Sequence, residues 1–115
     1  YDYELIRSSK DLTNEMESMI TSAEIPYKRG IHWTTDAGYR ETWGQVMDYR
    51  DKGALCVEME GVGLFTIANY RKCVATGIYV VSDVYSENDW KLGWEGNDIK
   101  RAVGAVIDMI IESIR

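Results

Sequence analysis

The chain has 115 residues, which suits one domain, and its 13 basic and 19 acidic residues give a formal net charge of −6. This acidic balance argues against a general nucleic-acid-binding protein, and no apolar run approaches the roughly 18 residues of a membrane span. A hydrophobic fraction of 45% with one proline argues against extended disorder, and two cysteines predict reduced thiols in a cytoplasmic protein.

The sequence alternates between segments of helical and of strand-like pattern. Helical segments carry apolar residues at three- and four-residue spacing, and strand-like segments are short apolar runs that end at turn residues. Ser8 and Asp11 predict a capping box for the first helix. In chain order, the pattern predicts a helix over 12–23, a strand over 30–34, a helix over 41–50, a strand over 54–59, a helix over 61–72, a strand over 74–84, a loop over 85–96 and a helix over 97–114 that is capped by Asn97.

The strand-like runs are continuously apolar rather than alternating. Such strands are typical of a mostly parallel or mixed sheet with helices on both faces, so the fold class is predicted to be α/β, a three-layer α/β/α sandwich. Ligands of such sheets bind beyond the carboxyl ends of the strands. Attention therefore goes to Thr34-Thr35-Asp36, to Glu58-Met59-Glu60 and to Ser82-Asp83.

Two carboxylates lie at the end of the second predicted strand. Glu58 and Glu60 share one face of the strand, and Met59 faces the other way. Burying two carboxylates is costly unless donors satisfy them, and a vicinal diol would do so. The alternative is that one glutamate is solvated and the other caps the following helix. The same tripeptide at 15–17 lies in mid-helix, so its position at a strand end carries the information.

The other two strand ends also carry polar groups. Asp83 follows an apolar strand, where partial burial favours the protonated carboxyl of a general acid, although a capping or loop role is equally open. Tyr39 can stack on a planar ligand and Arg40 can donate to a carbonyl, the alternative being packing and a surface ion pair. Asp36 and Thr42 suit turn or cap positions.

The remaining reactive side chains suggest no separate chemistry. His32 lies inside a strand without a second histidine or a nucleophile nearby, so we interpret it as structural. Cys56 and Cys73 are predicted to be buried hydrophobic residues. No metal site is predicted, because the acidic residues at 86–90 lack the spaced ligands and central glycine of a calcium loop.

The three strand ends, taken together, resemble the nucleoside phosphorylase family, which includes uridine phosphorylases, hexameric purine nucleoside phosphorylases and the related nucleosidases. The resemblance rests on Thr34-Thr35-Asp36 with Tyr39, on the stretch 57–61 (VEMEG), and on Ser82-Asp83, in that order. It implies that residues 1–115 are the C-terminal part of a phosphorylase-like domain, an incomplete form of the family's sandwich.

The resemblance also implies roles for individual residues. Glu60 and Met59, with Glu58, correspond to the ribose-binding residues, and Tyr39, Arg40 and Ser82 to the surroundings of the base. Asp83 corresponds to the acid that protonates a purine base as it leaves. The implied reaction is the reversible phosphorolysis of an N-glycosidic bond, which gives free base and ribose 1-phosphate, with phosphate as co-substrate and no cofactor.

Two features leave the implied function open. Asp83 favours a purine, whereas the stretch 34–42 (TTDAGYRET) is closest to uridine phosphorylases. The family's phosphate site lies in its N-terminal half, so we expect the isolated chain to be inactive and to need a complementing N-terminal segment or a homo-oligomeric partner. The alternatives are a non-catalytic nucleoside-binding or oligomerisation remnant, and a nucleosidase that hydrolyses the same bond.

Overall fold

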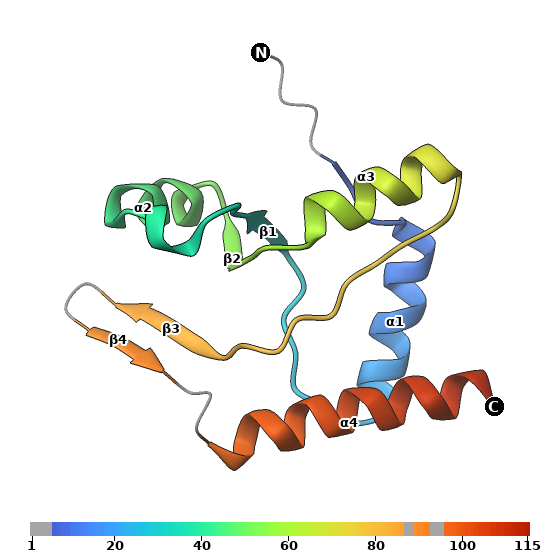
Figure 1. Ribbon diagram of the computed structural model, residues 1–115. Coiled ribbons are helices and arrows are strands. Elements are labelled where there is room, and N and C mark those ends of the chain that lie inside the picture. The colour runs from blue at the N-terminus through green and yellow to red at the C-terminus, as the bar shows by residue number, and fades with distance from the viewer. Residues whose placement is uncertain (1–5, 87–88, 93–95) are drawn as a thin grey trace. The chain divides into compact units, whose positions relative to one another are not determined.

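The computed structural model describes residues 6–86, 89–92 and 96–115 (Figure 1). The chain divides into two compact units, one formed by Tyr1–Asn14 with Lys28–Gly77 and the other by Glu15–Tyr27 with Ile78–Arg115. The helix α1 (Lys10–Ser22) begins in the first unit and ends in the second.

The first unit is built on two parallel strands, β1 (Ile31–Thr34) and β2 (Ala54–Glu58), which lie side by side in Figure 1. Their register pairs Thr34 with Glu58, so both strands end at the same edge. Beyond β1 the main chain stays attached to β2, because the Thr35 amide donates to the Glu58 carbonyl at 2.8 Å. The carboxyl ends of the strands therefore meet, as the sequence predicts.

The connection between the two strands is the helix α2 (Trp43–Asp51). Thr42 and Gln45 form a capping box at its start, with side-chain to backbone distances of 3.2 and 3.3 Å, which satisfies two backbone N–H groups. Trp33 of β1 stacks on Tyr49 of α2, with ring centroids 4.2 Å apart. This contact packs α2 against the strands. The capping box, in turn, shows Thr42 at one of the turn or cap positions predicted for it.

The helix α3 (Gly61–Arg71) follows β2 and ends at Lys72, whose left-handed backbone (φ 56°) closes the last turn. Phe65 is the buried apolar side chain of this helix, with only 5% of its surface exposed. Its ring packs against the His32 ring in a T-shaped arrangement, with the ring centroids 5.8 Å apart. Through this contact α3 is packed on the face of β1 that carries His32.

The second unit contains the hairpin of β3 (Asp83–Ser86) and β4 (Asp89–Leu92), followed by the long helix α4 (Asn97–Ile114), as Figure 1 shows. The hairpin is antiparallel and pairs Asp83 with Leu92. α4 is amphipathic, and Met109 is its buried residue. In the part of α1 that belongs to this unit, Ile20 is buried.

The fold class is confirmed, because helices combine with a small parallel sheet as in a partial α/β fold. The predicted strand over 74–84 is wrong, since residues 74–82 form no strand and β3 begins only at Asp83. A β-branched sequence favours an extended backbone, but a strand also needs a hydrogen-bonded neighbour. The described residues offer this segment no paired strand, although the Ala75 carbonyl accepts a hydrogen bond from the Ser9 amide at 2.8 Å.

Four smaller predictions also differ from the structure. Part of the predicted loop over 85–96 belongs to the β3–β4 hairpin. Ser9 rather than Ser8 caps α1, accepting from the Leu12 amide at 3.3 Å, and Asn97 is the first residue of α4 rather than its cap. Cys73 is exposed and Cys56 is half-buried, because Cys73 follows the end of α3.

Among the residues that the structure describes, no helix combines the length and the apolar character needed to span a membrane.

Gly53 provides a test of the turn that joins α2 to β2. Its φ of 91° disfavours any residue with a Cβ atom, although the space around the Cβ position is empty. Gly53→Ala should therefore lower the free energy of unfolding by about 1–2 kcal/mol through backbone strain alone. Urea unfolding measures this change. The control is Gly44→Ala inside α2, where alanine should leave stability unchanged or raise it; an equal loss in both variants would contradict the strain argument.

Candidate active site

The carboxylate of Glu58 is the centre of the polar cluster at the carboxyl ends of β1 and β2. One oxygen, Oε1, accepts a hydrogen bond from the Thr34 hydroxyl and lies 2.9 Å from Nδ1 of His32. The other, Oε2, accepts the backbone N–H groups of Glu60 and Gly61 at 2.7 and 2.5 Å. The side chain is 8% exposed. Both oxygens thus have two protein donors each, which offsets the cost of burying the charge.

Residues from both strands converge on this carboxylate because of the sheet register. His32 and Thr34 are two apart in β1 and share a face, and Thr34 lies opposite Glu58. The Thr34 hydroxyl also accepts the Val62 amide of α3 at 3.1 Å. Glu58 and Thr34 therefore satisfy three backbone N–H groups at the start of α3, which have no partner within the helix.

The hydrogen bonds keep Glu58 ionised. Burial by itself raises the pKa of the Glu58 carboxyl, but the hydrogen bonds stabilise the charged form more, so the pKa lies below the usual 4.5. The bonds that lower it come, in order, from the Thr34 hydroxyl, the Glu60 and Gly61 amides and the His32 ring. The α3 N-terminus further favours a negative charge at this place.

Gly61 is required by the close packing of this cluster. A Cβ atom at this position would lie 2.5 Å from Cε1 of His32 and 2.7 Å from Oε1 of Glu58. Neither atom can give way freely, because His32 and Glu58 are held to each other and Glu58 also accepts the amides of Glu60 and Gly61. Glycine is therefore needed here for space, whereas Gly63 has no atom within 4 Å of its Cβ position.

Met59 and Glu60, by contrast, are exposed at the junction of β2 and α3. Met59 has 55% of its surface exposed, and the Glu60 carboxylate accepts the Met59 amide at 3.2 Å. An exposed carboxylate beside an exposed thioether is able to accept hydroxyl groups and to pack against a sugar ring. The structure thus separates the two glutamates: Glu58 is held by the protein, and Glu60 faces outwards.

Tyr39 and Arg40 lie on the short 3₁₀ helix η1 (Gly38–Arg40), which follows β1. Tyr39 is 92% exposed, and Arg40 is exposed as well. The turn that leads to η1 is fixed by two buried residues, since the hydroxyl of Thr35 accepts the Ala37 amide at 3.4 Å. Tyr39 is therefore displayed to solvent from an anchored turn, a placement that leaves its ring available for stacking.

Ser82 and Asp83 belong to the second unit, where Asp83 begins β3. The Ser82 hydroxyl donates to Oδ1 of Asp83 at 2.8 Å. Asp83 is half-buried and Ser82 is exposed. The Ser82 hydroxyl thus contributes to the orientation of the Asp83 carboxylate.

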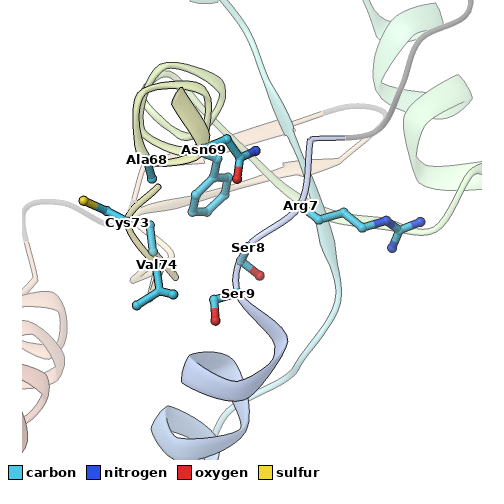
Figure 2. Close-up of a pocket in the computed structure, with 9 residues that line it drawn as sticks. Arg7, Ser8, Ser9, Ala68, Asn69, Cys73 and Val74 are labelled. Atoms are coloured by element: carbon cyan, nitrogen blue, oxygen red, sulfur yellow. The ribbon is translucent and has the colours of Figure 1, made fainter. Parts of the chain in front are cut away.

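A cavity of about 270 Å³ lies elsewhere in the first unit, between the start of α1 and α3 (Figure 2). Figure 2 shows Ser8 and Ser9 on one side, Asn69 and Cys73 on the other, and the Arg7 guanidinium directed away from them. None of the strand-end residues lines it.

No group of three metal-ligating side chains occurs within the described ranges. Burial, together with the Glu58 charge, raises the pKa of the half-buried Cys56 thiol, so this cysteine is poorly suited to act as a nucleophile.

The sequence pattern does not by itself reveal the partners of Glu58. His32 lies 2.9 Å from the Glu58 carboxylate, and the sequence by itself does not predict this link to the glutamate pair. The spacing of His32 and Thr34 on one face of a strand, next to a strand ending in Glu58, was the available signal. The contact itself depends on the register of β1 and β2, which places Thr34 opposite Glu58.

The chain belongs to the phosphorylase superfamily, whose sequence profile matches residues 2–112. It is similar to a DeoD-type purine nucleoside phosphorylase of Exiguobacterium sp. strain AT1b, with 34% identity over 73 residues that cover 64% of this chain and 31% of the relative. The DeoD-type purine nucleoside phosphorylase of Exiguobacterium sibiricum is 33% identical over 76 residues, 66% of this chain and 32% of the relative. The matched region thus spans about a third of the length of these relatives. No solved structure matches significantly.

The hydrogen bonds of Glu58 predict a specific pH dependence of stability. Because its folded pKa is below the usual 4.5, the ionised carboxylate stabilises the fold above that pH, and this contribution is lost as the pH falls through the folded value. Glu58→Gln should lower the free energy of unfolding at pH 7 by about 1.5–3 kcal/mol, and its difference from the wild type should shrink below pH 4.5.

Urea unfolding at several pH values measures both quantities. The matched control is Glu15→Gln, which removes an exposed glutamate from the mid-helix copy of the tripeptide and should change stability by less than about 0.5 kcal/mol. A loss for Glu58→Gln that stays constant down to pH 3 would contradict the assignment.

Proposed function

We propose that the protein is a nucleoside phosphorylase acting on purine nucleosides, with residues 1–115 forming the C-terminal part of its domain. The observation that carries the proposal is the pair Met59 and Glu60, exposed directly after β2 in a chain of the phosphorylase superfamily. In the proposed reaction, phosphate bonds to the sugar C1′ while the N-glycosidic bond breaks, and the base leaves with the bonding electrons. Phosphate is the co-substrate, and no cofactor is required.

The sugar is proposed to be held by the residues at the β2–α3 junction. The Glu60 carboxylate would accept the two ribose hydroxyls, and Met59 would pack beneath the ring. A carboxylate near the sugar also stabilises the positive charge that develops on the ring in the transition state. Tyr39 and Arg40, on the anchored turn after β1, are proposed to contact the base.

Asp83 is proposed to protonate the departing purine, oriented by the Ser82 hydroxyl. A leaving purine needs a proton on a ring nitrogen, and a carboxyl group can donate one. Both named relatives are purine nucleoside phosphorylases, which supports a purine rather than uridine as the substrate.

The phosphate site is proposed to come from a segment outside these residues or from a second copy. Apolar side chains are exposed on one helix of each unit, which supports such a partner, because surfaces of this kind are normally covered. They are Val62, Leu64 and Ile67 on α3, and Val103, Ile107, Ile110, Ile111 and Ile114 on α4.

Recognition of the ribose diol is the most direct test. Inosine should bind more tightly than 2′,3′-dideoxyinosine, and Glu60→Gln should weaken inosine binding about tenfold, the worth of one charge-assisted hydrogen bond, without affecting the dideoxy analogue. Amide chemical shifts of residues 59–61 on titration report the binding. Glu15→Gln is the control, and equal affinity of the wild type for both nucleosides would refute the proposal.

Asp83→Asn tests whether Asp83 is the proton donor. The test uses the protein together with the segment or second copy that supplies the phosphate site. The variant keeps the size of the side chain and loses the transferable proton, so phosphorolysis of inosine should slow by about 10²-fold or more. Uridine, which offers no equivalent ring nitrogen, should be affected much less. Initial rates of base release with both nucleosides give the comparison, and equal losses would show that Asp83 has a structural role.

A further inference from the structure

We propose that Glu58 is a positioning residue, which fixes the turn that presents Met59 and Glu60 to a nucleoside. The inference rests on the proposed function, since it assigns the ribose contact to Glu60. It gives Glu58 a different task from its neighbour: its carboxylate binds the protein rather than the sugar. The contacts of Glu58, Thr34, His32 and Gly61, which we call the junction cluster, carry the argument.

The first step is that Glu58 has little capacity left for a ligand. Each of its oxygens already has two protein partners, and the side chain is 8% exposed. To bind a ribose hydroxyl, the carboxylate would have to release at least one of the donors at the start of α3. Glu60 has no such constraint, because its carboxylate is exposed and accepts a single amide at 3.2 Å.

The second step is that the contact to Oε2 acts on the backbone of Glu60 itself. The Glu60 N–H donates to this oxygen at 2.7 Å and the Gly61 N–H at 2.5 Å, so the peptide groups on both sides of the Glu60 Cα are tied to one atom. This restricts the direction in which the Glu60 side chain leaves the main chain. The direction of the Glu60 side chain matters for binding, because a small displacement of a binding group weakens its interactions strongly.

The third step is that β1 fixes Glu58 in turn. The Thr34 hydroxyl donates to Oε1 and accepts the Val62 amide at 3.1 Å, which joins β1, β2 and α3 through one side chain. His32 holds the same oxygen and is itself packed against Phe65. The register of β1 and β2 therefore fixes the position of Glu58, and through Glu58 the position of Glu60, the proposed ribose-binding residue.

The test measures the ratio of the affinities for inosine and for 2′,3′-dideoxyinosine in variants of the junction cluster. In Glu58→Gln one of the two carboxylate oxygens is replaced by an N–H₂ group, which cannot accept a hydrogen bond. The two donors that faced this oxygen therefore lose their acceptor. This ratio should fall about tenfold, while the affinity for the dideoxy analogue stays within twofold. Gly61→Ala should act similarly, and Gly63→Ala should leave the ratio unchanged.

A rescue pair keeps the test decisive if Glu58→Gln does not fold. Thr34→Val removes the hydroxyl at nearly constant volume and should lower the ratio, whereas Thr34→Ser retains the hydroxyl and should restore it. If Glu58 merely stabilises α3, the variants lose stability in urea but the folded protein keeps the wild-type ratio, and that outcome overturns the inference. If the wild type itself shows no preference for inosine, the proposed function fails instead, and the inference falls with it.

Discussion

A buried, ionised glutamate at the end of a strand has to be satisfied by its surroundings, and most of the first unit is arranged to do so around Glu58. The strand register brings His32 and Thr34 to one oxygen, and the start of α3 brings two amides to the other. The small residue at Gly61 follows from the same constraint, because any side chain there would enter the space of the cluster. The strand register, the start of α3 and the glycine at position 61 thus meet at a single carboxylate.

This arrangement explains how two similar residues acquire different tasks. Glu58 and Glu60 lie two positions apart, yet the strand ends between them and the chain turns into a helix. The Glu58 carboxylate is buried against the protein, and its hydrogen bonds offset the cost of removing it from water. Glu60 is exposed to solvent, with the exposed Met59 beside it. In the proposed phosphorylase, the buried glutamate organises the site and the exposed one meets the sugar.

The two units differ in how much of their structure is supported by their own contacts. In the first, hydrogen bonds and the packing of Trp33 and Phe65 connect the strands to both helices. In the second, a two-stranded hairpin precedes a long amphipathic helix whose apolar side chains are largely exposed. The β-branched segment 74–82 shows the same dependence, since its sequence favours a strand but the strand needs a partner to form.

The sequence by itself determined the elements whose signals are local. The helical spacing predicts α2, α3 and α4 nearly at their observed bounds, and the apolar runs predict β1 and β2. Thr42 is predicted at a turn or cap position, and it caps α2. It also located the polar groups after β2, because composition changes sharply at a strand end. Only the tertiary structure decided which donors reach Glu58, why position 61 needs a glycine and that 74–82 forms no strand. Those features depend on the strand register and on residues that are distant in the sequence. A local sequence pattern contains no information about such contacts, because their partners lie outside it.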